Sequence, residues 1–260
     1  MWLRLVLGLP ALTLAIMVTM PIAALAMGAT LDDLQAAVTD GEVLSAVGLS
    51  LGCAMASVVL GLCLGVPAAY LLARRYVPGA RLWQALLDLP VVIPHPIVGI
   101  GLLLVFGRNR LVGAALRDNF GITVVSAIPG IVIAMLVVSS PFIVRAAYEG
   151  FMAVPLAVER TARSLGAGEL RVFRTIALPQ ALRHIRSGAL MAWARAISEF
   201  GSVVILAYYP RTAPVLIWDR FSAYGLRSAL APALVLLCVC LTIFVLLQAL
   251  DSRPALRRRS

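Results

Sequence analysis

The chain has 260 residues, of which 62% are apolar and only 13% are charged, and its formal net charge is +10. A soluble globular domain is about 45–50% apolar and about 25% charged, so lipid must cover part of this surface. All 22 basic residues are arginine, which excludes lysine-based catalysis and the lysine of phosphate-binding loops. Any use of ATP therefore requires another chain. The positive charge lies between apolar runs, which favours membrane orientation over binding to nucleic acid.

Six apolar stretches are long enough to cross about 30 Å of bilayer hydrocarbon as helices of about 20 residues. The first of them is too long for a secretory signal and five others follow it, so we interpret it as a membrane helix. The sequence predicts an all-α integral membrane protein with six spans near residues 5–27, 43–73, 89–107, 124–145, 188–209 and 228–250.

The segments that connect these spans differ in arginine content. The N-terminus, residues 74–88, residues 145–187 and the tail after residue 250 hold 15 arginines, whereas the other connections hold six. Because positive charge accumulates on the cytoplasmic side, we expect both termini to be cytoplasmic. The acidic segment 28–42 is then external, and the basic tail 251–260, with Arg253 and three arginines at 257–259, lies at the anionic inner leaflet.

Small residues recur at four-residue spacing along the second predicted span. Gly48, Gly52 and Ala56 form one such row, and Gly61 and Gly65 form another. Small residues at this spacing allow helix backbones to approach closely in lipid. We therefore expect the second span to pack closely against its neighbours.

The cysteines and one serine motif bear on chemistry in the membrane. Residues 48–52 match the G-x-S-x-G pattern of hydrolases, so an intramembrane hydrolase built on Ser50 and His95 is one hypothesis. That motif requires a strand–turn–helix context, which a long apolar run does not provide. The cysteines show no ligand spacing, and we expect no metal site at Cys53, Cys63, Cys238 or Cys240.

The longest polar connection, residues 145–187, has a regular pattern. It predicts two short amphipathic helices, 149–165 and 169–176, separated by the glycines at 166 and 168. Leu178 and Pro179 are expected to end the second helix. A helix–glycine–helix element between two spans either lies on the membrane surface or fits a groove of a partner protein. The residue pattern alone leaves both interpretations open.

Residues 158–179 resemble the EAA loop of ABC importer permeases. The matching positions are Glu159, Ala162, Gly166, Ile176, Leu178 and Pro179. Arg160 and Thr161 depart from the family pattern. The resemblance implies that this loop is a coupling element, which docks into a cleft on a separate ATPase subunit and transmits closure of the ATP-bound ATPase dimer to the membrane helices.

Two further segments narrow the resemblance to the molybdate/tungstate permeases. This resemblance extends over the chain from about residue 43 onward. Residues 88–95 read D-L-P-V-V-I-P-H, and residues 207–217 read A-Y-Y-P-R-T-A-P-V-L-I. The S-E-F-G portion at 198–201 is also similar to sulfate permeases. Sulfate or thiosulfate is therefore an alternative solute, and an ATP-independent secondary carrier is an alternative of a different class.

The resemblance implies a particular assembly. It is a type I ABC importer permease fold in a homodimer, with two ATPase copies, an extracytoplasmic oxyanion-binding protein and surrounding membrane lipid. The chain would hold no cofactor and perform no catalysis itself. Residues 1–42 would form the first helix and an acidic loop, residues 43–250 the permease domain, and residues 251–260 the tail.

Ionisable residues inside the spans are candidates for the translocation pathway, because burying them in a membrane is costly. Arg195 and Glu199 stand at i and i+4 in the fifth predicted span, where they can neutralise each other. The alternative interpretation is that Arg195 or its hydroxyl neighbours face the pathway. Ser198 and Ser202 would then donate hydrogen bonds to oxyanion oxygens without trapping the ion.

The third predicted span contains a second candidate. His95 lies between Pro94 and Pro96, and two prolines leave backbone carbonyls free and break a helix. His95 therefore either bonds a freed carbonyl at a kink or lines a gate. Gly99 and Gly101 follow, and their spacing suits close packing across a dimer.

Overall fold

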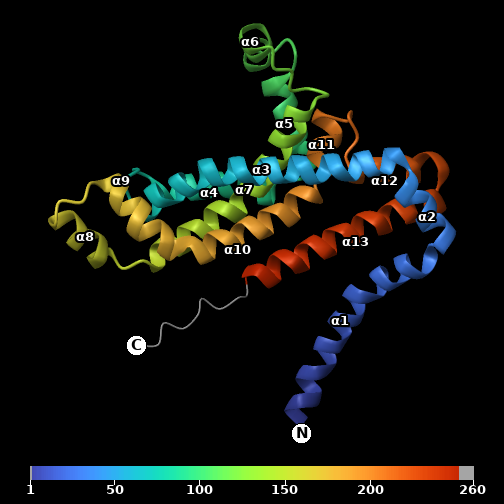
Figure 1. Cartoon of the computed structure of the whole chain (residues 1–260), viewed down its shortest axis with the longest axis horizontal. Helices are drawn as coiled ribbons and strands as arrows, with labels where there is room; N and C mark the ends of the chain where they lie inside the picture. Colours follow the sequence, from blue (N-terminus) through green and yellow to red (C-terminus); the bar gives the residue numbers. More distant parts are fainter. Residues whose placement is uncertain (1, 252–260) are drawn as a thin grey trace.

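The computed structural model describes residues 2–251, and within this range it contains helices and no strands (Figure 1). Its elements in chain order are α1 (Trp2–Gly28), α2 (Leu31–Thr39), α3 (Gly41–Ala73), α4 (Ala80–Val92), α5 (His95–Phe106), α6 (Leu111–Phe120), α7 (Ile128–Ala153), α8 (Leu156–Ser164), α9 (Glu169–Val172), a π-helical turn η1 (Phe173–Ala177), α10 (Leu178–Ile197), α11 (Gly201–Leu206), α12 (Ala213–Tyr224) and α13 (Leu226–Asp251). The predicted all-α class is confirmed. The expectation for the basic tail falls on residues 252–260, which lie outside the described residues.

Four helices of the described chain are long and apolar enough to cross a membrane. They are α1 over Gly8–Gly28, α3, α7, and α13 over Leu226–Ala249. They correspond to the first, second, fourth and sixth predicted spans. α7 continues to Ala153, so part of the segment that we assigned to the polar connection belongs to this helix.

The third predicted span is not one continuous helix. It consists of α4 and α5, which are bent by 113° relative to each other at a short break. Pro94 occupies the N-cap of α5. Because proline has no backbone N–H, a helix arriving from α4 cannot continue its hydrogen-bond ladder through this position. Sequence patterning located the break but not the size of the bend.

The prediction that the fifth span, 188–209, is one unbroken helix is wrong. α10 begins at Leu178 and ends at Ile197, and α11 begins only at Gly201. Counting the bent pair as one span gives up to five candidate spans in residues 2–251, so six continuous spans are not confirmed. The polar residues Arg183, His184 and Arg186 lower the hydropathy of α10.

The connection between α7 and α10 differs partly from the prediction. Gly166 has φ +86°, in the left-handed region, and ends the first short helix as expected. The stop expected at Leu178–Pro179 is absent, because α9, η1 and α10 follow one another directly. Pro179 lies in the first turn of α10, where a missing N–H costs nothing.

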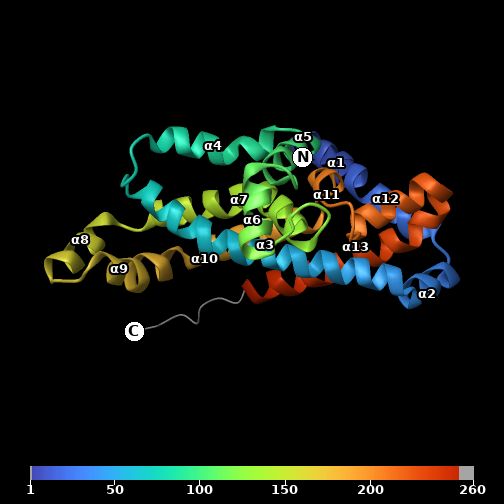
Figure 2. The same cartoon turned by 90° about the horizontal axis from the view of Figure 1, so that it is seen from above.

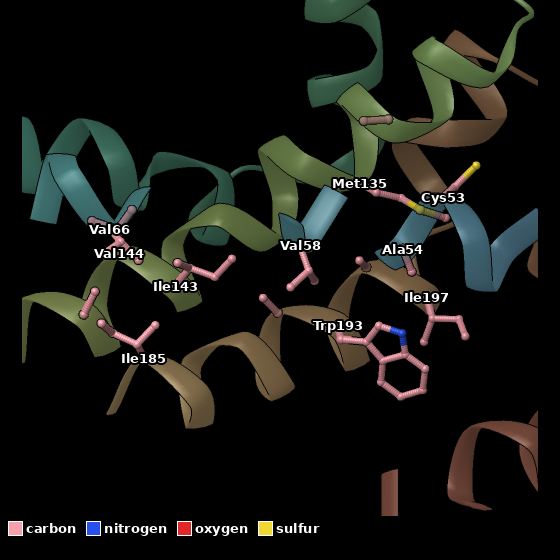
Figure 3. Close-up of a cluster of buried hydrophobic side chains, with 14 of the residues drawn as sticks. Cys53, Ala54, Val58, Val66, Met135, Ile143, Val144, Ile185, Trp193 and Ile197 are labelled. Atoms are coloured by element: carbon pink, nitrogen blue, oxygen red, sulfur yellow. The ribbon is translucent and has the colours of Figure 1, made fainter. Parts of the chain in front are cut away.

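Helix α7 forms the centre of the bundle and contacts α3, α4, α5, α10 and α11. Figure 3 shows apolar side chains from α3, α7 and α10 that meet in this core. A Cβ atom added at Gly61 would lie 2.6 Å from Ile143 Cδ1, so glycine allows this close approach. Gly65 likewise faces Val144, whereas Gly48 has open space around it. Close packing of the second span is thus confirmed at its second glycine row.

The elements are arranged along one long axis (Figure 1). α8 and α9 lie at one end, and α2 and α12 lie at the other, while α5 and α6 project to the side of the bundle. Figure 2 shows α4 running along a separate side from α3 and α13. α1 diverges from the bundle, and none of its apolar window is buried.

Candidate functional site

The two helix breaks meet and bring together ionisable residues that are 100 positions apart. His95 is the first residue of α5, Arg195 lies in the last turn of α10, and Glu199 lies in the break before α11. Arg195 Nη2 is 2.7 Å from Glu199 Oε2, and His95 Nδ1 is 3.1 Å from the same oxygen. Arg195 Nη2 also lies 2.5 and 2.8 Å from the two ring nitrogens of His95. We refer to His95, Arg195 and Glu199 as the central cluster.

Glu199 is fully buried and acts as the anchor of this cluster. Its Oε1 accepts hydrogen bonds from the backbone N–H and from the hydroxyl of Ser202, each at 2.8 Å. Ser202 lies in the first turn of α11, so the carboxylate caps an otherwise unsatisfied helix terminus. The predicted pairing of Arg195 with Glu199 is confirmed, and the carboxylate also interrupts the helix at this point.

The cationic side of the cluster remains accessible. The Arg195 side chain is 22% exposed and the His95 side chain is 33% exposed, whereas Glu199 is 0% exposed. A guanidinium has five N–H donors, and the contacts described above involve only Nη2. A further donor, on Nη1, reaches Ser198 Oγ at 3.3 Å. Arg195 therefore keeps hydrogen-bond donors for a ligand.

The two serines differ in their surroundings. Ser198 is exposed, and its hydroxyl donates to the carbonyl oxygen of Arg195 at 3.1 Å. Ser202 is buried and its single hydroxyl proton is directed to Glu199. Ser202 thus positions the carboxylate in this arrangement, while Ser198 lies beside the exposed guanidinium.

Glycines hold the two broken helices close together. A Cβ atom at Gly201 would lie 2.9 Å from His95 Cβ, and one at Gly99 would lie 2.9 Å from the backbone oxygen of Ser202. Gly99 therefore packs against α11 of the same chain, whereas Gly101 has open space around it, and packing across a dimer stays a prediction. Pro94 fixes the start of α5, so His95 points toward α10 from a rigid corner.

A mostly apolar cavity lies between α4, α7 and α10, on the α8 side of the central cluster. It has a volume of about 220 Å³, with space for several water molecules. Val91, Arg145, Glu149 and Met191 are among the residues that line it, and Met191 lies one helical turn before Arg195. Arg145 Nη2 bonds Asp88 Oδ2 at 2.9 Å and so links α7 to α4.

Sequence reasoning missed Arg145 as a site residue, because it was assigned to the boundary of the polar connection. Asp88 could have indicated a basic partner in the membrane region, since it is an acidic residue at the start of a predicted span. No periodicity identifies its partner 57 residues away.

The second candidate element is the segment from α8 to the start of α10. Glu159 in α8 is fully buried, although the sequence placed it on a partner-facing loop. Its carboxylate forms an ion pair with Arg74, accepts from Arg163 Nη2 at 3.0 Å and accepts from Tyr70 O–H at 3.2 Å. Arg74 is only 3% exposed. Glu159 therefore fastens α8 to the end of α3.

The remaining matched positions of this segment lie around the glycine turn and the start of α10. Ala162, Ile176 and Leu178 are partly buried, and Gly166 and Pro179 are exposed. Apolar side chains extend outward nearby, because Leu165 is 83% exposed and Leu170 is 66% exposed. We refer to residues 158–179 as the coupling segment. Its outer surface is apolar and basic.

The hydrolase alternative from the sequence is weakened by geometry. Ser50 is fully buried, donates to the carbonyl oxygen of Ala46 at 2.9 Å and accepts from Ala213 N–H at 2.8 Å. This hydroxyl caps α12 and has no nearby base in those contacts. Among the described residues, the cysteines are free and no group of acidic, histidine and cysteine side chains could hold a metal ion.

The apolar spans, the broken helices and the charged cluster at their junction are the features of a membrane-spanning transport subunit. Residues 61–255 match the family described as binding-protein-dependent transport system inner membrane component. The chain belongs to this family, and the predicted kinship with ABC importer permeases is confirmed.

Individual relatives are also similar over most of their length. The molybdate/tungstate transport system permease protein WtpB of Pyrococcus furiosus is 45% identical over 86% of this chain and 84% of its own. The molybdenum transport system permease protein ModB of Escherichia coli is 38% identical over 72% of this chain and 83% of its own.

Solved structures share the fold. A chain of a bacterial ABC transporter involved in the import of the acidic polysaccharide alginate superposes with a TM-score of 0.78, at 17% identity, over 98% of this chain and 96% of its own. A chain of the MetNI methionine ABC transporter superposes with a TM-score of 0.60, at 18% identity, over 81% and 93% of the two chains.

Proposed function

We propose that this chain is the permease subunit of an ATP-driven importer that moves tungstate and molybdate across the cell membrane by alternating access. The names of relatives at 45% and 38% identity support this solute class. The family membership supports a subunit that leaves ATP hydrolysis to a partner, as does the absence of lysine from the sequence.

The observation that carries the proposal is the partly exposed face of the central cluster that Arg195 and His95 form. Arg195 and His95 offer N–H donors at a junction of broken helices, which is where transport proteins place polar backbone and ligand groups. Glu199 offsets the charge of Arg195, so a dianion is attracted only weakly. Weak attraction suits a pathway, because the ion must leave as readily as it enters.

Each site residue has a role in this scheme. Arg195 and His95 contact the oxyanion, and Ser198 adds a hydroxyl beside them. Glu199 and Ser202 hold the guanidinium and the start of α11 in place, and Pro94 fixes the corner that presents His95. The cavity toward Arg145 supplies the next part of the route.

The coupling segment connects this site to the ATPase. Its outer surface, including Leu165 and Leu170, docks on an ATPase subunit, while Glu159 anchors the inner side to α3. α9, η1 and α10 are continuous, so a displacement of the segment moves α10 and with it Arg195. ATP-driven closure is thereby transmitted to the central cluster.

The wider assembly follows from the same proposal. Two copies of this chain form a homodimer with two ATPase subunits, and an extracytoplasmic binding protein delivers the anion. The arginine distribution favours an orientation in which both termini and the α8 end are cytoplasmic.

The proposal is tested by ATP-dependent uptake of labelled tungstate into proteoliposomes that contain this chain, its ATPase and its binding protein. Excess molybdate should compete and excess sulfate should not. A Gly166→Val variant should assemble but lose uptake, because a β-branched residue at φ +86° is strained by about 1–3 kcal/mol. Equal competition by sulfate would contradict the solute class, and uptake without the ATPase would contradict the coupling.

A further inference from the structure

A second cavity lies on the face of α10 opposite to Arg195. Its volume is about 460 Å³ and its walls come from α3, α10 and α13. Arg186 precedes Arg195 by nine residues, or about two and a half helical turns, which places the two arginines on opposite sides of the helix. The cavity is lined by Met55, Val58, Arg186, Ala189, Leu190, Trp193 and Leu247. We refer to it as the α10 groove.

Except for Arg186, the residues that line the groove are apolar. Met55 is 49% exposed, whereas Val58 and Trp193 are almost fully buried. The groove is therefore open at its surface and rigid at its base. In the hydrocarbon of a bilayer, such a groove is filled by an apolar chain, because water has no polar partners there.

One end of the groove carries positive charge. Arg186 and Arg183 are both exposed, one turn apart on α10. Within residues 2–251, neither guanidinium has a hydrogen bond or an ion pair, whereas Arg74, Arg145 and Arg195 each have a carboxylate partner. Arg186 at the end of the apolar groove, with Arg183 one helical turn away, complements a ligand with an anionic head and an apolar tail.

We propose that the α10 groove binds one anionic phospholipid of the leaflet on the α8 side. Its phosphate contacts Arg186 and Arg183, and one acyl chain lies along Leu190 and Trp193. A free phosphate ion would leave the apolar walls unused, and a neutral lipid would leave both arginines unpaired. Basic pockets between membrane helices recognise lipid headgroups through this combination.

The position of the groove connects lipid to transport. α10 carries the groove on one face and the central cluster on the other, so the bound lipid packs directly behind the helix that holds Arg195. The inference does not depend on which anion is transported.

Trp193 is a built-in reporter for this lipid. A parent variant with Trp2, Trp83 and Trp218 changed to phenylalanine leaves Trp193 as the single tryptophan. The parent is reconstituted in vesicles of phosphatidylcholine and phosphatidylglycerol, with bromine on the acyl chains of one lipid at a time. Bromine quenches a nearby indole, so the fluorescence reports which lipid lies in the groove.

We expect stronger quenching by brominated phosphatidylglycerol than by brominated phosphatidylcholine at the same mole fraction. Arg183→Gln combined with Arg186→Gln should remove this preference, and Arg186→Lys should retain it. Arg171→Gln, which removes an exposed arginine of α9 outside the groove, should leave the preference unchanged. Gel filtration verifies that each variant is folded.

Three results would overturn the proposal. Equal quenching by both lipids would show that the groove accepts any acyl chain. Absence of quenching by either lipid would show that protein, such as a second copy of this chain, covers the groove. Loss of the preference on addition of inorganic phosphate would show that the arginines bind a free anion.

Discussion

Two fully buried glutamates organise this molecule, one at each functional region. Glu159 in the coupling segment and Glu199 in the central cluster are both 0% exposed, and each pairs with a neighbouring arginine at i±4 and with a second basic residue from a distant part of the chain. The partners differ in accessibility. At Glu159, Arg74 is 3% exposed and Arg163 is 30% exposed, whereas at Glu199 both partners, His95 and Arg195, are partly exposed, at 33% and 22%.

This difference in accessibility separates a structural role at Glu159 from the ligand-contact role that we propose for the partners of Glu199. At Glu159 the main cation is sealed in, so the charges serve to hold α8 against α3. At Glu199 both basic partners are partly exposed, so in the proposed scheme they present N–H donors to a ligand while the carboxylate weakens the attraction of Arg195 for an anion. In the proposed scheme, a buried acid therefore anchors the coupling segment in one place and adjusts a binding surface in another.

The largest effect is expected from Glu159→Ala. The substitution leaves Arg74 buried without a counter-charge, and breaking a buried pair costs about 3–5 kcal/mol. The free energy of unfolding in detergent should fall by that amount, with Glu169→Ala at the exposed start of α9 as a control. Normal stability together with lost ATPase stimulation would show instead that Glu159 faces the partner.

Arg195→Gln should affect transport more than stability. Glu199 keeps His95 and Ser202 as partners, so the fold persists. Loss of a charge-assisted contact of about 1.5–3 kcal/mol predicts a fall in uptake of about tenfold or more. Labelled tungstate uptake in proteoliposomes measures this, and Arg195→Lys should lose less. Unchanged uptake in the glutamine variant would remove Arg195 from the pathway.

The Asp88–Arg145 pair is more exposed than either glutamate site, with side chains 26% and 67% exposed. Exposed pairs contribute about 0.2–1 kcal/mol. A double-mutant cycle of Asp88→Asn and Arg145→Gln on the free energy of unfolding should give a coupling in this range. Additive single effects would show that the pair does not hold α4 to α7.

The smallest effect is expected at the α2 end. A hydrogen bond from Arg220 holds the pKa of Asp40 below its ordinary range. The folded state therefore binds a proton less readily than the unfolded state, and the stabilisation exists above about pH 4 and is lost as the pH falls through the lowered pKa. The difference in melting temperature between the wild type and Asp40→Asn should shrink below about pH 4. A difference that is independent of pH would contradict this.

Local patterns predicted much of this molecule. Apolar run length located four spans, four-residue spacing paired Arg195 with Glu199, and glycine located the turn at Gly166. These features depend on neighbours within a few residues. The partners of His95 and Glu159 lie 100 and 85 residues away in sequence, and no periodicity specifies such contacts.

The errors also have physical causes. The break after α10 coincides with the cap that Glu199 forms on Ser202 at the start of α11, a local contact that the apolar character of residues 188–209 did not indicate. The continuity at Leu178–Pro179 arises because proline is tolerated in the first turn of a helix. A proline marks either the end of one helix or the start of another, and sequence alone leaves that open.

The central claim, that the oxyanion contacts Arg195, is tested most directly by charge replacement. Arg195→Cys is made in a background that lacks Cys53, Cys63, Cys238 and Cys240, and is treated with thiol reagents carrying either an ammonium or a sulfonate group. The account predicts that the ammonium reagent restores tungstate uptake, that the sulfonate reagent does not, and that tungstate slows modification while sulfate does not. The account would be contradicted if uptake were the same after treatment with the positively and the negatively charged reagent, and if tungstate did not change the rate of modification.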